Sequence, residues 1–220
     1  MGKLIVIEGL DGSGKGTQAQ ILCERLEKEG RKVKKISFPV YSSDSSALVR
    51  MYLAGQFGSR PGDVNAYAAS SFYAVDRFAS FKADWGKDYN DDYIIIADRY
   101  TTSNGVHQCS KLPEDEWKTF MKWLYDYEYT KMGIPKPDIV VYLDMSPTVS
   151  QKLLTSRYNG DTSKKDIHEK DKRYLENSRM AAGFFVAEDG WKKIECDDGK
   201  KPYTIEKIAN TVYDKIKHLL

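Results

Sequence analysis

The sequence predicts an α/β protein in which a doubly wound, five-stranded parallel sheet carries helices on both faces. Apolar runs of strand length alternate with segments of helical periodicity along the whole chain. Two of the runs, residues 92–98 (DYIIIAD) and 137–145 (PDIVVYLDM), are almost continuously apolar, as in strands that are buried on both sides of a parallel sheet. A glycine-rich turn joins the first strand to the first helix, which is typical of parallel βαβ units.

The strand predictions rest on short β-branched and apolar runs. The five predicted strands are residues 3–8, 32–38, 92–98, 137–145 and 191–196. The first helix follows the glycine-rich turn, because Ala19, Leu22, Cys23 and Leu26 recur on one helical face and Gly30 is a natural stop.

The remaining helices are predicted from periodicity and from terminus signals. They are residues 44–57, 63–85, 114–129, 146–157 and about 166–187, and a last helix with Ile205, Ile208, Ala209, Val212, Ile216 and Leu219 on one face. Ser163 and Asp166 are spaced as a capping box, and residues 157–165 (RYNGDTSKK) are predicted to form a polar loop before it. Without an internal repeat or a linker, the sequence predicts one domain over residues 1–220.

Composition argues against several classes of protein. The formal net charge is +2, which gives no support for nucleic-acid or membrane binding as the main activity. The three cysteines are far apart and show no metal-ligand spacing, so we expect reduced thiols in a cytoplasmic protein. The apolar run at the N-terminus is too short for a signal peptide or a membrane span.

Residues 9–17 (GLDGSGKGT) match the phosphate-binding P-loop pattern except at one position. Gly16 stands where the pattern has Ser or Thr, and Thr17 follows one residue late. Glycines let backbone N–H groups converge on phosphate oxygens at a helix N-terminus, and the lysine adds a cation. The predicted ATP-binding residues are Gly9, Leu10, Asp11, Gly12, Ser13, Gly14, Lys15, Gly16 and Thr17.

Gly16 removes a direct hydroxyl ligand for Mg²⁺ but leaves the phosphate cradle intact. Mg²⁺ keeps several waters and is readily held by a carboxylate. Asp98 ends a predicted central strand, at the sheet edge where such sites lie, and is the predicted metal-binding residue, acting through water. A helix N-cap is the alternative role for Asp98, and the two roles are compatible.

The loop form GSGKGTQ resembles that of adenylate kinases and other P-loop nucleoside monophosphate kinases. The wider chain resembles the thymidylate kinase family through GLDGSGKGTQ, FP at 38–39, FYAVDR at 72–77, DRYTTSNGVHQ at 98–108, PDIVVYLDM and the region RY…DIHEKDKRYL. The resemblance implies a nucleoside monophosphate kinase fold with a short lid at about 157–166, and transfer of a phosphoryl group from ATP to dTMP with Mg²⁺. It also implies a homodimer.

The resemblance implies roles in binding the acceptor nucleotide for several residues. Asp11 matches the aspartate that accepts a hydrogen bond from the 3′-hydroxyl, and Tyr73 matches the aromatic residue that stacks on the base. Arg77 and Arg99 match arginines that hold the acceptor phosphate, for which a planar guanidinium is suited. A surface ion pair with Asp76 or Asp98 is the alternative for these arginines.

Other residues complete the expected acceptor pocket. Asn104 matches the segment that reads the edge of thymine, because an amide offers both a donor and an acceptor. His107 stands where tyrosine is frequent near the sugar. The further residues expected to bind the acceptor are Phe38, Pro39, Arg50, Ser103 and Gln108.

The resemblance also bears on catalysis. The stretch DGSGK has no charge between Asp11 and the Gly-Lys pair, and related enzymes of that kind take a catalytic cation from the lid. We expect Arg157 to supply it, with Lys164 and Lys165 as the other lid cations. The expected catalytic residues are Lys15, Arg99 and Arg157.

Other functions remain open at this point. A kinase for a different (deoxy)nucleoside monophosphate fits the same loop. A deoxynucleoside kinase would not need Arg77 and Arg99 to hold an acceptor phosphate. A P-loop switch protein would carry an NKxD motif after a strand, where this chain has IIIADR and VYLDMS. A structural α/β protein is the remaining alternative.

Overall fold

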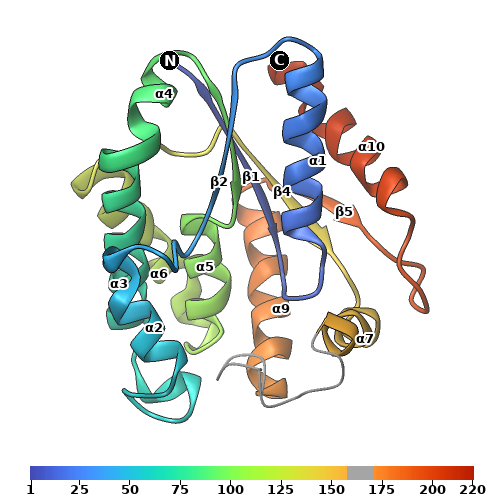
Figure 1. Ribbon diagram of the computed structural model, residues 1–220. Helices are drawn as coiled ribbons and strands as arrows, with labels where there is room; N and C mark the ends of the chain where they lie inside the picture. The colour runs from blue at the N-terminus through green and yellow to red at the C-terminus, as the bar shows by residue number, and fades with distance from the viewer. Residues whose placement is uncertain (158–170) are drawn as a thin grey trace.

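The computed structural model describes residues 1–157 and 171–220, and within them it confirms the predicted parallel sheet (Figure 1). The strands are β1 (Lys3–Gly9), β2 (Val33–Ser37), β3 (Ile94–Asp98), β4 (Ile139–Asp144) and β5 (Lys192–Glu195). Every pairing is parallel, and the order is β2-β3-β1-β4-β5.

Side chains of the central strand alternate between two apolar layers. Leu4 and Val6 of β1 belong to one buried cluster, whereas Ile5 and Ile7 belong to the other. The helices that cover the Leu4 face are α3 (Ala66–Ser80), α5 (Thr101–Cys109), α6 (Trp117–Tyr125) and α9 (Lys172–Glu188). The helices that cover the Ile5 face are α1 (Lys15–Lys28) and α10 (Ile205–Ile216). The sheet is therefore enclosed by helices on both faces (Figure 1).

Several predicted helices are shorter than expected or are divided. The first part of predicted helix 44–57 is a 3-10 turn, Asp44–Ser46, before α2 (Ala47–Leu53). The predicted helix 63–85 becomes α3, a π-helical turn at Phe81–Trp85 and α4 (Gly86–Asn90). The predicted helix 114–129 becomes a 3-10 turn at Glu114–Glu116, α6 and a second π-helical segment, Asp126–Lys131.

Two helices flank the predicted lid. Helix α7 (Pro147–Arg157) matches its predicted range. Helix α9 begins at Lys172, because the Asp171 carboxylate accepts a hydrogen bond from the Tyr174 N–H at 3.0 Å. The predicted helix start near 166, the Ser163–Asp166 capping box and most of the predicted lid lie outside the described residues.

The strand order places the candidate site. β1 lies next to β3 in the sheet. The chain continues from β1 into α1 on one face of the sheet, and from β3 into α5 on the other face. In open parallel sheets, ligands bind beyond the carboxyl ends of the strands at such a point. The turn from β1 into α1 and the residues that follow β3 meet there. In the part of the chain described, no helix is both long and apolar enough to cross a membrane.

Candidate active site

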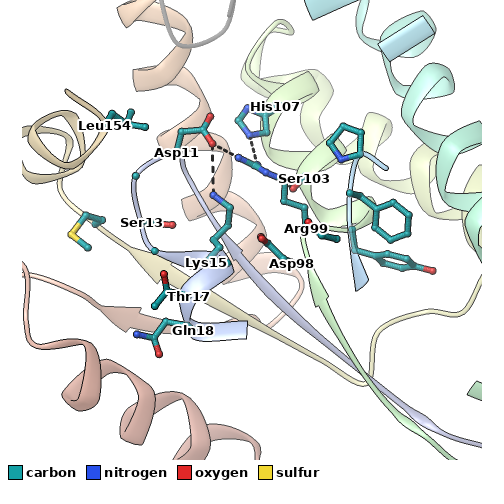
Figure 2. A pocket seen from close by; sticks show the side chains of 18 of the residues that line it. Asp11, Ser13, Lys15, Thr17, Gln18, Asp98, Arg99, Ser103, His107 and Leu154 are labelled. Carbon is teal, nitrogen blue, oxygen red and sulfur yellow. Dashed lines mark hydrogen bonds and ion pairs between the residues drawn. The ribbon is translucent and has the colours of Figure 1, made fainter. Parts of the chain in front are cut away.

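A cavity of about 920 Å³ opens at the carboxyl edge of the sheet (Figure 2). It brings together most of the residues that the sequence predicts. Those that line it are Asp11, Gly12, Ser13, Gly14, Lys15, Gly16, Thr17, Phe38, Pro39, Tyr73, Arg77, Asp98, Arg99, Ser103, Asn104, His107 and Gln108. Gly9, Leu10 and Arg50 are the predicted residues with described side chains that do not line it.

The P-loop backbone takes conformations that favour glycine. Gly12 and Gly14 have φ values of 81° and 86°, in the left-handed region. A Cβ on Gly12 would also come within 2.6 Å of the Ser150 carbonyl oxygen in α7. These glycines let the loop turn tightly into the N-terminus of α1, where backbone N–H groups and the helix dipole favour a phosphate.

Lys15 extends from the first turn of α1 toward the loop and is nearly buried, with 7% of its surface exposed. Its Nζ donates to the Leu10 carbonyl oxygen at 2.9 Å and lies 3.8 Å from Asp11 Oδ1. Burial and the nearby Arg99 cation lower the pKa of Lys15 to about 8. An anion beside Lys15 would oppose both effects, so the position suits a phosphate group.

Arg99 reaches the same carboxylate from the other side of the cavity (Figure 2). Its Nη2 donates to Asp11 Oδ1, and its Nη1 lies 3.2 Å from His107 Nε2 and 3.5 Å from Ser103 Oγ. The Arg99 backbone has a φ of 67°, a costly conformation for a residue with a side chain. Such strain is typical of functional positions, and here it accompanies a guanidinium fixed between Asp11 and His107.

His107 is held as a neutral ring. Burial and the adjacent Arg99 cation lower the pKa of His107 to about 3. Because a guanidinium only donates, Nε2 must be the acceptor of the Arg99 contact. The ring also stacks on Tyr174 of α9, with centroids 6.0 Å apart and planes inclined by 19°. His107 therefore positions Arg99 and adds no charge of its own.

Asp98 ends β3 beside the first turn of α1. Its buried Oδ1 has no hydrogen-bond partner among the described residues. A Cβ on Gly16 would lie 3.0 Å from Asp98 Oδ2. No group of three His, Cys, Asp or Glu residues that could hold a metal occurs in the described ranges. An unpaired carboxylate oxygen fits Mg²⁺, which takes its remaining ligands from water and phosphate.

Arg77 of α3 also lines the cavity and is paired with an unexpected partner. Its Nε and Nη2 donate to Glu128 Oε2 and Oε1 at 2.7 and 2.6 Å. The predicted alternative, an ion pair with Asp76, is wrong, because Asp76 instead accepts from the Val40 N–H and the Ser45 hydroxyl. Arg77 is only 1% exposed, so its charge is balanced in the protein interior.

Arg50 does not itself line the cavity, and its expected contact with the acceptor stays a prediction. Its Nη1 donates to the carbonyl oxygens of Tyr41 and Ser43 at 2.9 and 2.8 Å, and to Ser46 Oγ at 2.6 Å. These bonds hold Nη1 against the turn that follows β2, beside Tyr41, which lines the cavity. Arg157 is the last residue of α7, and its side chain lies outside the described part of the structure.

Sequence reasoning missed two buried carboxylates behind the cavity. Glu8 of β1 accepts from the Gly9 N–H at 3.0 Å and from the Thr102 and Ser103 hydroxyls at 2.8 and 2.7 Å. Glu128 accepts from residues of α3 and α5. An acidic residue at the end of an apolar strand and one within the aromatic run 123–129 were the available signals.

An apolar wall completes the cavity on the side of α7 and α10. The residues that form it are Met145, Leu153, Leu154, Pro202, Tyr203, Ile205 and Ile208. No pattern in the sequence predicted this wall. It lies beside the P-loop, since Leu154 Cγ would be 3.1 Å from a Cβ on Gly12, and it offers apolar contact rather than charge.

Comparisons with known proteins agree with this geometry. The family model of thymidylate kinase matches residues 7–198. A thymidylate kinase of Mycobacterium tuberculosis is 30% identical over 190 residues, covering 86% of this chain and 87% of that protein. A probable thymidylate kinase of Methanococcus maripaludis is 28% identical over 222 residues and covers both chains fully.

A solved structure supports the fold. The thymidylate kinase of Candida albicans superposes with a TM-score of 0.72 at 22% identity, covering 99% of this chain and 92% of that one. With a P-loop, an opposing arginine and a family match over most of its length, this chain belongs to the thymidylate kinase family.

Proposed function

We propose that this chain transfers the γ-phosphoryl group of ATP to dTMP, giving dTDP. The observation that carries the proposal is the cluster of Lys15, Asp11 and Arg99, in which one carboxylate joins the P-loop lysine to an arginine from the opposite side of the cavity. Phosphoryl transfer needs two charged nucleotides brought together and neutralised, with little covalent work by the protein.

On the donor side, the P-loop amides and Lys15 hold the β- and γ-phosphates of ATP. The low pKa of Lys15 fits this role, because an arriving phosphate restores its full charge. The wall that includes Met145, Leu154 and Tyr203 gives the donor base an apolar surface. Asp98 would hold Mg²⁺ through water, and the ion would supply positive charge to the phosphates.

On the acceptor side, Arg99 holds the phosphate of dTMP, and Asp11 accepts from the sugar hydroxyl. Arg99 suits the phosphate because its Nη1 contacts are to neutral partners, at 3.2 Å or more. The phosphate role predicted for Arg77 has less support, since two of its three guanidinium nitrogens are bound to Glu128. Tyr73, Phe38 and Pro39 line the part of the cavity proposed for the base.

Further parts of the proposal rest on the resemblance. They are a catalytic cation at Arg157, a cytoplasmic location and a homodimer. Light scattering on the purified protein tests the dimer, with a single species of about twice the chain mass of 25.1 kDa as the expected result.

Transfer of label tests the proposed reaction. ATP labelled in its γ-phosphate is incubated with Mg²⁺ and dTMP, and the products are separated. We expect label in dTDP, and a loss of about 10²–10³ in rate for Lys15→Ala, because electrostatic stabilisation of the transferred group is lost. Lys28→Ala, an exposed lysine at the end of the same helix, is the matched control and should keep the full rate. A dTDP fraction that contains no label would contradict the proposal.

A further inference from the structure

Glu128 is a buried carboxylate that touches two walls of the cavity from behind. It is completely buried, in the π-helical segment Asp126–Lys131, and is absent from the described residues that line the cavity. Its two oxygens accept four hydrogen bonds, which is the full capacity of a carboxylate. The donors are Arg77 Nε and Nη2, Thr101 Oγ1 at 2.7 Å and Asn104 Nδ2 at 3.2 Å.

These bonds determine which way the Asn104 amide faces. Nδ2 donates to Glu128 Oε1 and to the Ser70 carbonyl oxygen at 3.0 Å. Both partners are acceptors without a hydrogen, so a flipped amide would set oxygen against oxygen twice. The amide nitrogen is therefore committed to the interior, and Oδ1 is the amide atom left for the cavity that Asn104 lines.

The same carboxylate determines which guanidinium nitrogen of Arg77 is available to a ligand. Glu128 binds Nε and Nη2, and this leaves Nη1, whose contact to the Tyr100 carbonyl oxygen is long at 3.5 Å. Nη1 carries two hydrogens, so at least one is available to a ligand. Since the Arg77 charge is balanced by Glu128, the site favours a neutral acceptor atom over a second anion.

Arg77 and Asn104 stand side by side, because Glu128 Oε1 accepts from both. Together they present an N–H donor next to a carbonyl acceptor. A base edge with a carbonyl oxygen next to a ring N–H, as in thymine and uracil, matches this pair. A cytosine edge has the reverse pattern, with an amino group next to an unprotonated ring nitrogen, and it would leave both protein groups unpaired.

We propose that Glu128 is a positioning residue that selects a 2,4-dioxopyrimidine acceptor over a 4-aminopyrimidine one. It contacts no substrate and acts by fixing the polarity of the Arg77–Asn104 pair. The inference rests on the proposed function, because it names the residue that orders the acceptor-base side of the same cavity.

Glu128→Gln tests the inference by replacing one acceptor oxygen with an amide donor of the same shape. At least one of the bonds to Arg77 or Asn104 is then lost or reversed. We expect the ratio of kcat/KM for dTMP to that for dCMP to fall by about tenfold or more, through a higher KM for dTMP. The KM for ATP should be unchanged, and Glu128→Asp should recover part of the ratio.

Thr101→Val is the matched control. It removes one hydrogen bond to Glu128 but leaves the bonds to Arg77 and Asn104 in place. It should lower the melting temperature and keep the dTMP to dCMP ratio within about twofold, because the Thr101 hydroxyl bonds to Glu128 and not to Arg77 or Asn104. An unchanged ratio in folded Glu128→Gln, or an equal fall in both variants, would overturn the inference.

A second measurement uses the wild-type protein and does not depend on how the variants fold. Binding of dTMP is compared with binding of its N3-methyl derivative, which lacks the ring N–H. We expect at least a tenfold weaker binding of the derivative, because Asn104 Oδ1 then faces a methyl group. Equal binding would refute the polarity assigned to Asn104. If the wild-type protein does not phosphorylate dTMP at all, the proposed function fails, which is a separate result.

Discussion

The carboxylate of Asp98 lies so close to Gly16 that a Cβ on Gly16 would come within 3.0 Å of Asp98 Oδ2. This contact gives a physical reason for a glycine at position 16, where the P-loop pattern has Ser or Thr. A side chain at position 16 and the Asp98 carboxylate compete for the same space. Other P-loops carry a hydroxyl at this position, whereas in this chain the Asp98 carboxylate approaches it from β3.

Gly16→Ala should therefore impair the use of Mg²⁺. The added methyl group displaces Asp98, and a small misplacement of a positioned group is expected to lower kcat by about tenfold and to raise the Mg²⁺ concentration needed for half-maximal rate. Rates measured across a Mg²⁺ titration check this. Gly183→Ala is the control, because a Cβ there meets no atom within 4 Å. An unchanged Mg²⁺ curve for Gly16→Ala would remove Asp98 from the metal site.

Binding of ATP should take up a proton above pH 8. The pKa of Lys15 is lowered to about 8 without nucleotide, so at pH 8.5 most of the lysine is neutral. Phosphate beside Nζ raises that pKa, and a proton enters on binding. Calorimetry at pH 8.5 in two buffers of different ionisation enthalpy measures the uptake. Lys15→Arg stays charged and should show none, whereas uptake of the same size in this variant would assign the proton elsewhere.

Acid should destabilise the protein through His107. The folded-state pKa of about 3 lies below the unfolded value of 6.5, so the unfolded chain binds a proton that the folded chain excludes. Stability is complete above pH 6.5 and falls as the pH drops toward 3. Between pH 7.5 and 5.5 this group lowers the free energy of unfolding by about 1.4 kcal/mol.

Urea unfolding of wild-type protein and His107→Gln at those two pH values isolates this contribution. From pH 7.5 to 5.5, the free energy of unfolding of His107→Gln should fall by about 1.4 kcal/mol less than that of the wild type. His218→Gln, at an exposed position near the C-terminus, should lose as much as the wild type. Parallel losses in all three proteins would show that His107 is protonated in the folded state.

Arg157→Ala should lower kcat more than it raises the KM for dTMP. A cation that acts on the transferred phosphoryl group stabilises the transition state and not the ground state. Steady-state kinetics with dTMP varied at saturating ATP separates the two constants. Lys152→Ala, at an exposed position of the same helix, is the control. A change in KM alone would mean that Arg157 binds substrate without promoting transfer.

The parts of the fold that the sequence predicts well are those with local causes. The P-loop follows from glycines with positive φ, and the buried face of α1 follows from helical spacing of Ala19, Leu22, Cys23 and Leu26. The sheet follows from apolar runs that need burial on both faces. Each of these signals is complete within a short stretch of sequence.

Helix α5 was not predicted, because its stability comes from packing. Its sequence, TTSNGVHQC, combines β-branched residues, asparagine and glycine, which are weak helix formers. Eight of its nine residues are buried, and a Cβ on Gly105 would come within 2.5 Å of the Phe185 ring in α9. Close contact between two helices far apart in the sequence therefore maintains this element.

The partner of Arg77 could not be predicted for a similar reason. Glu128 lies 51 residues away, and the two meet because α3 and the π-helical segment after α6 cover the same face of the sheet. For Arg50 the structure shows local partners, and the expected contact with the acceptor stays a prediction. Its expected role came from resemblance, whereas its actual partners are carbonyl oxygens of the adjacent turn.

Whether the cavity accepts dTMP is tested most directly by the rate of ADP release with ATP and Mg²⁺ across a panel of acceptors. The panel comprises dTMP, dUMP, dCMP, UMP, CMP, AMP, GMP and thymidine, and kcat/KM is measured for each. We expect dTMP to have the highest value and thymidine, which brings no phosphate to Arg99, to be a poor acceptor. A higher value for thymidine or for any other monophosphate would contradict the assignment of this cavity to dTMP.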